Sequence, residues 1–156
     1  MLVELNIIAV EKANRTEATA KSVTRMLNYA ATHSEAITRY HASDMILHIH
    51  SDASFISETG AKSRSGGYHY IRRASADPKR PPPKQTPLNG PYHVECTTIR
   101  NFLASEMEAG LVALFVNCQR GAATRMSLID MGHAQPPTPE VTDSVKGDRF
   151  VNGNIR

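Results

Sequence analysis

A cluster of prolines restricts the fold of this chain more than any other feature of its sequence. Six of the nine prolines crowd into a short stretch: Pro78, Pro81, Pro82, Pro83, Pro87 and Pro91. Because proline lacks a backbone N–H and fixes φ, this stretch can form neither a helix nor a central strand. We therefore predict an extended loop over residues 77–91, which separates two groups of secondary-structure elements.

This loop belongs to a basic segment. Between residues 60 and 85 the only acid is Asp77, against seven basic residues: Lys62, Arg64, Arg72, Arg73, Lys79, Arg80 and Lys84. The net charge of the whole chain is only +3, so the remainder is acidic. A concentrated basic segment is what recognition of a nucleic-acid backbone requires, but a solvated loop without a partner has the same composition. Both interpretations stay open.

Length and composition place the chain among globular proteins. Its 156 residues, 40% of them hydrophobic, suffice for one core of ordinary size. Two cysteines without CxxC spacing, Cys96 and Cys118, indicate a reducing, intracellular setting, and we expect both to be small buried residues. The longest apolar run, residues 109–116, is too short to span a membrane, and the N-terminus lacks the basic region of a signal peptide. We expect a soluble protein without a membrane partner.

The hydrophobic pattern predicts an α/β fold with a mixed sheet flanked by helices. Helical spacing predicts a helix over about residues 14–32. A strand is predicted at "MILHIHS", a second at residues 66–74 after a turn at Gly66 and Gly67, and a third at 91–99. Apolar residues recur at three and four from Asn101 to Met131, which predicts one long helix or two helices broken near Gly121. The short strand "EVT" then ends at Asp143.

The stretch "HIHSD" places titratable side chains at the end of a strand. Side chains two apart share a face, so His48, His50 and Asp52 point one way and Leu47, Ile49 and Ser51 the other. One hypothesis is a site for iron or zinc built from His48, His50 and Asp52. The other is that Asp52 and the later Asp143 hold Mg²⁺ for phosphoryl chemistry, since adjacent carboxylates repel unless a cation lies between them. The remaining histidines, including His41, His69 and His93, are expected at the surface or in hairpins.

Four blocks of the sequence resemble a known family. "HASDMILHIHSDAS", "AKSRSGGYHYI", "EMEAGLVALFVN" and "QPPTPEVTDS" look like the ribonuclease H domain that follows reverse transcriptase in copia-type LTR retrotransposons. The preceding "TAKSVTRMLNYAATH" is similar to the helix that ends the reverse transcriptase connection region. The resemblance implies that residues 1–40 are the tail of that connection region. It also implies that residues 41–156 are a ribonuclease H-like domain derived from a retrotransposon polyprotein.

The resemblance also implies an activity. Family enzymes hydrolyse the RNA strand of RNA:DNA hybrids during reverse transcription, with four acidic residues and two Mg²⁺ ions. By position, Asp52 matches the acid of the first strand, and Asp143 matches the acid of the family's "TDS"-like block. Lys62, Arg64, Arg72 and Arg73 would contact the hybrid's phosphates. The implied partners are such a hybrid and the rest of the reverse transcriptase polyprotein.

The sequence departs from the family at the second acid. The position that matches this metal ligand is Gly110. On a helix Glu106 lies one turn from Gly110, roughly 6 Å along the axis, whereas Glu108 points away. Glu106 is therefore the better substitute, although acids in a first helical turn also commonly just complement the helix dipole.

The fourth acid is expected beyond Arg156, so we expect a truncated domain whose catalysis is weak or lost. Asp148, in "VKGDRFVNGNIR", is expected to be a surface residue. A nucleic-acid-binding or structural remnant without catalysis is the alternative.

Overall fold

The computed structural model describes residues 2–58, 60–73, 89–144 and 151–153. Most of the predicted loop over residues 77–91, and Asp148 with it, therefore lies outside the described residues. The chain divides into two compact units, Met1–Thr38 and Arg39–Arg156.

The N-terminal unit is helical. It contains α1 (Leu2–Val10), the 3-10 helix η1 (Glu11–Ala13) and α2 (Glu17–Thr32). Helix α2 begins at Thr16, whose side chain and that of Thr19 cap each other's backbone N–H groups. Thr19 also donates to Glu11 Oε2 at 2.7 Å, which ties the start of α2 to η1. The helix predicted over 14–32 is confirmed, whereas α1 was not predicted.

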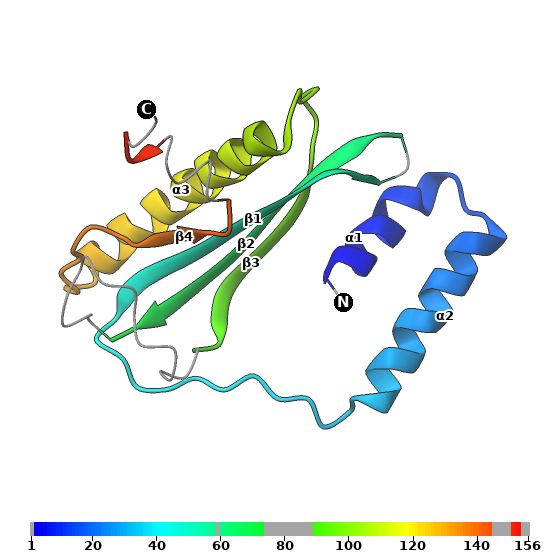
Figure 1. Ribbon diagram of the computed structural model, residues 1–156. Helices are drawn as coiled ribbons and strands as arrows, with labels where there is room; N and C mark the ends of the chain where they lie inside the picture. Colours follow the sequence, from blue (N-terminus) through cyan, green and yellow to red (C-terminus); the bar gives the residue numbers. More distant parts are fainter. Residues whose placement is uncertain (1, 59, 74–88, 145–150, 154–156) are drawn as a thin grey trace. The chain divides into compact units, whose positions relative to one another are not determined.

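The second unit is built on a four-stranded mixed sheet (Figure 1). Its strands are β1 (Ile46–Glu58), β2 (Lys62–Arg72), β3 (Pro91–Ile99) and β4 (Glu140–Thr142). They lie in the order β3-β2-β1-β4, in which β1, β2 and β3 pair antiparallel and β4 runs parallel to β1. The prediction of an α/β fold with a mixed sheet is confirmed.

The predicted turn at Gly66 and Gly67 is wrong. Both glycines lie inside β2, where Gly66 pairs with Asp52 and Gly67 with Ser51. The chain turns instead at Gly60 and Ala61, which have φ angles of +80° and +54°. A glycine pair suggests a turn by composition, but here the missing side chain of Gly67 leaves room for Asn117 of a helix that packs on the strand.

That helix is α3 (Glu106–Asp130), which crosses one face of the sheet without a break at Gly121 (Figure 1). A Cβ at Gly121 would overlap the side chain of Ile49, so this glycine permits close packing. The residues of α3 that are buried are mostly small: Ala109, Gly110, Ala113, Asn117, Gly121 and Leu128. Two of the large apolar residues that recur at helical spacing along this stretch, Phe115 and Met126, are exposed.

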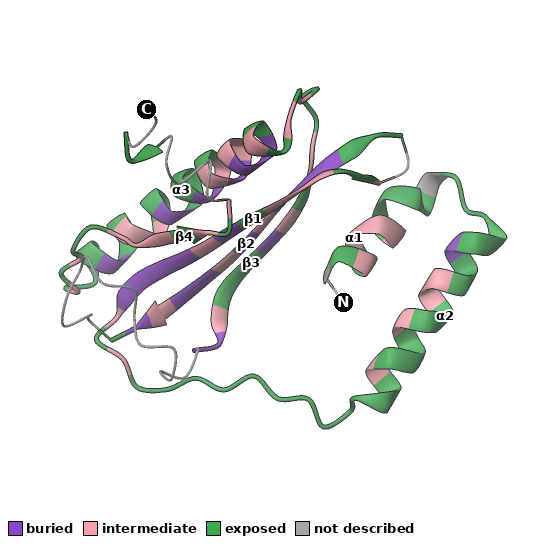
Figure 2. Ribbon diagram, in the orientation of Figure 1, coloured by how far each residue is buried: buried purple, intermediate pink, exposed green. Residues whose placement is uncertain are grey.

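The apolar core lies between β1 and α3 (Figure 2). Leu47, Ile49 and Leu128 form its centre, with Met45 and Ile71 packed against them. On the opposite face of the strand pair, His48 lies beside Tyr70, as the predicted alternation along β1 requires. The alternation is confirmed.

Side chains extend the sheet beyond the short strand β4. Gln135 accepts a hydrogen bond from the Leu47 N–H at 3.1 Å and donates to the Met45 carbonyl at 2.7 Å, as a paired strand would. Arg125 of α3 donates to the carbonyl of Pro136 and to Thr138 Oγ1. These bonds fix the segment that leads into β4 and therefore the position of Asp143 at its end.

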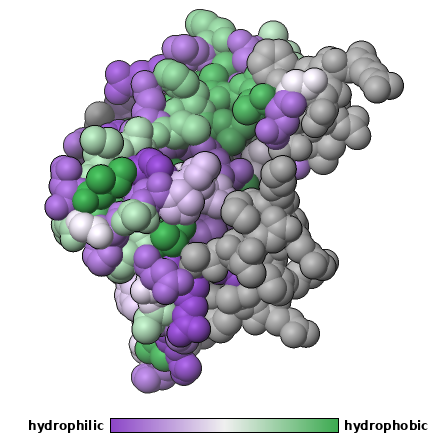
Figure 3. All heavy atoms as spheres, turned by 90° about the vertical axis from the view of Figure 1, so that its left-hand side faces the viewer, coloured by the Kyte–Doolittle hydropathy of each residue, from purple (hydrophilic) through white to green (hydrophobic). Residues whose placement is uncertain are grey.

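The surface mixes polar and apolar groups. On the face shown in Figure 3, hydrophobic side chains lie between hydrophilic ones. Among the helices in the described ranges, none combines the length and the apolar character needed to cross a bilayer.

Candidate functional site

A pocket lies where β1, β4 and the start of α3 meet. Its volume is about 300 Å³. It is lined by Ala53, Ser105, Glu106, Met107, Gly110, Asp143 and Ser144. Three positions singled out from the sequence, Glu106, Gly110 and Asp143, therefore meet in one pocket.

Strand pairing brings Asp143 to this place. Because β4 runs parallel to β1 with Thr142 beside Ser51, the residues that follow β4 lie level with the part of β1 just beyond Ser51. Asp143 comes directly after β4, and Ala53 is two residues beyond Ser51.

The two glutamates in the first turn of α3, Glu106 and Glu108, have different roles. Ser105 caps the helix by accepting the Glu108 N–H at 3.2 Å, and Glu108 in turn accepts the Ala104 N–H at 2.6 Å. The Glu108 carboxylate is thus committed to the helix start, while Glu106 lines the pocket. This geometry agrees with the expectation that Glu106 is the acid on the pocket side.

Gly110 has a packing role that was not expected from the sequence. A Cβ at this position would lie 3.3 Å from both Cβ and Oγ of Ser144, which is tighter than ordinary contact. Ser144 is held there by a hydrogen bond from its N–H to Thr142 Oγ1, at 3.2 Å. The glycine therefore lets the segment after β4 lie directly against α3.

Asp52 lies near the pocket but not in its lining. Its side chain is exposed, and its Oδ1 accepts the Ala53 N–H at 2.7 Å. Alternation along β1 puts Asp52 on the face of the strand shared with His50, opposite the face that α3 covers. The structure thus brings together two of the three predicted acids and leaves the third on the neighbouring face.

The donor set fits magnesium only in part. Mg²⁺ in proteins is commonly held by one or two carboxylates and several waters, and Glu106 and Asp143 are such a pair. Within the described ranges, however, no group of three or more His, Cys, Asp or Glu side chains is arranged to hold a metal ion. The residues present fit one loosely held ion better than a two-metal site.

The histidines of β1 pack around Tyr70. The His48 ring, 4% exposed, stacks on Tyr70 at 5.5 Å, and His50 Nε2 lies 3.0 Å from the Tyr70 hydroxyl. Burial, with Arg72 and His50 nearby, lowers the pKa of His48 to about 4. Burial and Arg72 also lower the pKa of His50. Contacts with Tyr70 thus accommodate both imidazoles without a metal ion.

The four basic residues expected to contact phosphate differ in exposure. Arg64 is 5% exposed and forms an ion pair with Glu58, and Arg72 is 9% exposed. Because their side chains are buried, these two arginines are poorly placed to contact phosphate directly. Lys62 and Arg73 are exposed. The other basic residues of the segment, Lys79, Arg80 and Lys84, lie outside the described residues.

The expectation that both cysteines are buried is wrong. Cys96 is half-buried and Cys118 is exposed. Cys118 donates to Glu140 Oε2 at 2.6 Å, and partial burial together with this carboxylate raises the pKa of its thiol to about 11. Cys118 does not lie on the side of α3 that faces the sheet, because small residues occupy that side.

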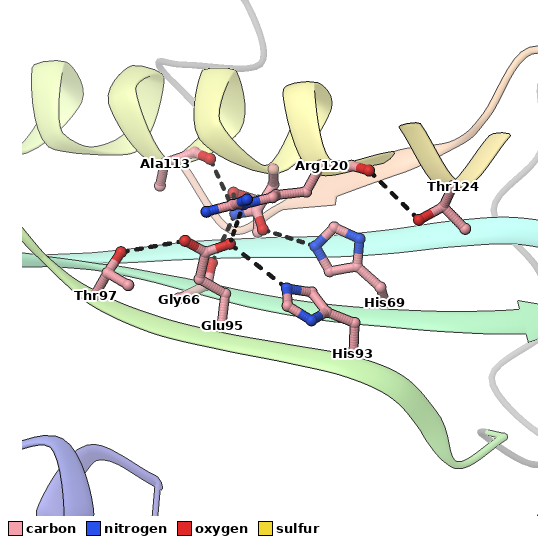
Figure 4. A network of polar contacts seen from close by, with 10 residues as sticks. Gly66, His69, His93, Glu95, Thr97, Ala113, Arg120 and Thr124 are labelled. Carbon is pink, nitrogen blue, oxygen red and sulfur yellow. Dashed lines mark hydrogen bonds and ion pairs between the residues drawn. The ribbon is translucent and has the colours of Figure 1, made fainter. Parts of the chain in front are cut away.

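Sequence reasoning missed a polar network beneath α3 (Figure 4). His69, expected at the surface, is fully buried and lies 2.9 Å from Asn117 Oδ1. Two signals could have indicated it. His69 is in phase with Gly67 along β2, and Asn117 is i+4 from Ala113 on a helix stripe of small residues.

Comparison with known proteins adds no relative. No protein-family model matches the chain, and neither a curated protein nor a solved structure matches it.

Proposed function

We propose that the second unit is a ribonuclease H-like domain derived from a retrotransposon polyprotein. Its ancestral activity is Mg²⁺-dependent hydrolysis of the RNA strand in RNA:DNA hybrids, and this chain retains little or none of it. The observation that carries the proposal is the pocket in which Glu106, Gly110 and Asp143 meet. These are positions at which the resemblance expects acidic residues, or their nearest substitute.

The order of elements supports the same proposal. A strand that carries an aspartate is followed by a hairpin, a helix with acids, and a strand that ends at a second aspartate. Strand β4 pairs parallel with β1, which brings the end of that last strand beside the first. This is the layout of a two-metal nuclease.

The pocket's own residues define what the site can do. Glu106 and Asp143 supply the carboxylates, and the Ser105 and Ser144 side chains line the same space. A magnesium ion bound there would activate a water and stabilise the leaving oxygen of the RNA backbone. Lys62 and Arg73, the exposed basic residues of β2 and its end, are available to a phosphate backbone.

Two differences from the family's set of metal ligands account for the weak catalysis that we propose. Gly110 supplies no carboxylate, and Asp52 lies on the other face of β1. Since phosphoryl transfer depends almost entirely on positioning and charge, the loss of metal ligands reduces the rate steeply.

The proposal is tested by magnesium titration and hybrid cleavage with the full chain. Calorimetry is expected to show one weak Mg²⁺ site that Asp143→Asn and Glu106→Gln each abolish. Glu108→Gln is the matched control and leaves Mg²⁺ binding unchanged, because that carboxylate caps the helix. Cleavage of an RNA:DNA hybrid is expected to be slow or undetectable. Fast cleavage, or the absence of any Mg²⁺ binding, contradicts the proposal.

A non-catalytic nucleic-acid-binding remnant is the second candidate. Specific support comes from the described residues, in which no group of three acids or histidines is arranged for a metal ion. This candidate predicts hybrid binding that falls with salt and that Lys62→Gln and Arg73→Gln weaken, without any effect of Mg²⁺. Mg²⁺-enhanced binding that Asp143→Asn removes would exclude it.

A transition-metal site at His48, His50 and Asp52 is a third candidate, suggested by their spacing alone. Elemental measurement of zinc, iron and copper in the purified chain tests it. An absence of all three metals would rule it out.

A further inference from the structure

The buried contact between His69 and Asn117 joins helix α3 to the sheet. Asn117 Nδ2 lies near three oxygen atoms: Ser51 Oγ at 3.0 Å, the Gly66 carbonyl at 2.9 Å and the Ala113 carbonyl at 2.9 Å. On its other side Oδ1 lies 2.9 Å from His69 Nε2. Both side chains have an exposed fraction of 0%. One amide thus connects α3 with β1 and β2.

These contacts fix the tautomer of His69. Because the Asn117 amino group faces oxygen atoms, its Oδ1 must be the atom that faces the imidazole, and Oδ1 can only accept. His69 therefore donates from Nε2 and keeps its lone pair on Nδ1. In the part of the chain that the structure describes, buried Nδ1 has no hydrogen-bond partner. A proton added at Nδ1 would thus be charged and buried without an acceptor.

The charged and titratable groups around His69 would do little to stabilise a positive charge on its ring. Strand β3 contributes Tyr92 and His93, whose ring centroids lie 6.1 Å and 5.1 Å from that of His69. Glu95, also on β3, lies 3.5 Å from Arg120 of α3 and 3.7 Å from His93 (Figure 4). The neighbour of His69 on β1 is Ile49, which is apolar. The carboxylate of Glu95 is therefore shared between Arg120 and His93.

We infer that His69 and Asn117 form an acid-sensitive latch, in which neutral His69 holds α3 against β1 and β2 and protonation of His69 releases the helix. Glu106 and Gly110 are on the same helix, so release of α3 also opens the pocket. The regulatory consequence rests on the proposed function. The latch itself does not, because it is defined by contacts away from the pocket.

The direction of the pH response follows from linkage. Burial lowers the pKa of His69, an effect only partly offset by the hydrogen bond that His69 donates to Asn117. The released state, in which the ring meets water, has the ordinary histidine pKa of about 6.5. The released state therefore binds the proton more tightly. The latch is fully stable above about pH 6.5 and weakens as the pH falls below it, by up to about tenfold per pH unit.

Hydrogen–deuterium exchange of the full chain tests the latch. Exchange in α3 is measured at about pH 7.5 and about pH 5, after correction for the intrinsic pH dependence of exchange. We expect protection of the α3 amides around Asn117 to fall by about tenfold or more at the lower pH. His69→Gln places a non-titrating amide N–H where Nε2 was, so its α3 protection should fall less between these pH values than that of the unmodified chain, and only through other buried groups such as His48. His41→Gln, at an exposed histidine, should respond as the unmodified chain does.

Results from two experiments would overturn the inference. One is an α3 response to pH that is the same in His69→Gln as in the unmodified chain. The other comes from nitrogen-15 NMR of the His69 imidazole in the unmodified chain, which does not depend on the variant's folding. A proton on Nδ1 at neutral pH, or titration of His69 without a parallel change in α3 exchange, contradicts the latch. Neither readout requires hybrid cleavage or Mg²⁺, so failure of the latch and failure of the proposed function are separate outcomes.

Discussion

Asn117 of α3 lies directly over Gly67 of β2, so close that a Cβ on Gly67 would overlap Oδ1 and lie 2.8 Å from Cγ of Asn117. Close packing at this point therefore requires both the glycine on the strand and the asparagine on the helix. Gly67 leaves the space, and Asn117 fills it with an amide whose polar atoms have partners on β1, β2 and α3. This relationship sets how near α3 comes to the sheet.

Gly67→Ala is predicted to destabilise the second unit by about 1–3 kcal/mol, because the added methyl displaces Asn117. Gly66→Ala is the matched control on the same strand. Its Cβ would lie 3.6 Å from the Asp52 carbonyl, which is ordinary contact, so little change is expected. Urea unfolding of the variants measures the difference. Equal losses at the two glycines would show that strand propensity and not the contact with Asn117 is responsible.

Asn117→Ala is predicted to cost about 2 kcal/mol or more of unfolding free energy, because it leaves three polar groups on β1 and β2 without their hydrogen-bond partner. The Ser51 hydroxyl, the Gly66 carbonyl and the His69 imidazole would each lose a partner. Gln119→Ala, at an exposed position of the same helix, should change stability by less than about 0.5 kcal/mol. Thermal or urea unfolding with a helix-sensitive signal distinguishes them.

The stability of the chain is predicted to fall in acid because of His48. Its pKa is lowered to about 4 by burial and by Arg72 and His50, whereas the unfolded chain has the ordinary value of about 6.5. The unfolded state therefore binds the proton first. The contribution of His48 is complete above about pH 6.5 and is lost progressively down to about pH 4, by up to roughly 1 kcal/mol per pH unit.

His48→Gln should flatten this part of the curve of unfolding free energy against pH. His33→Gln, at an exposed histidine, should leave the slope unchanged. A slope unaffected by His48→Gln would indicate that other groups cause the acid sensitivity.

Gly110→Glu is predicted to tighten Mg²⁺ binding by about tenfold or more, because a third carboxylate joins Glu106 and Asp143 in the pocket. The new side chain must first displace Ser144 by a few tenths of an ångström. Gly110→Ala makes the same close contact without the charge and serves as the control. Calorimetry with Mg²⁺ is the measurement. If alanine and glutamate behave alike, the pocket does not bind the cation through this position.

Local sequence signals determined much of the architecture. Alternation at Leu47, His48 and Ile49 predicted β1 and its two faces, because side chains on a strand alternate whatever surrounds them. Helical spacing predicted the helix that contains Asn117, and the short strand before Asp143 was also predicted. Strands and helices of this kind express local preferences, which a sequence carries directly.

Only the tertiary structure decided which side of α3 is buried and where the acids lie. By hydrophobicity alone Phe115 would face the sheet, but Gly67 and Gly121 allow so close an approach that only small residues and Asn117 fit between. His69 became a buried partner of Asn117 for the same reason. Parallel pairing of β4 with β1 placed Asp143 in the pocket that Glu106 also lines. Asp52 is not in that pocket, because its side chain is on the other face of β1. Close packing and strand register depend on residues far apart in the chain, so the local pattern of the sequence does not specify them.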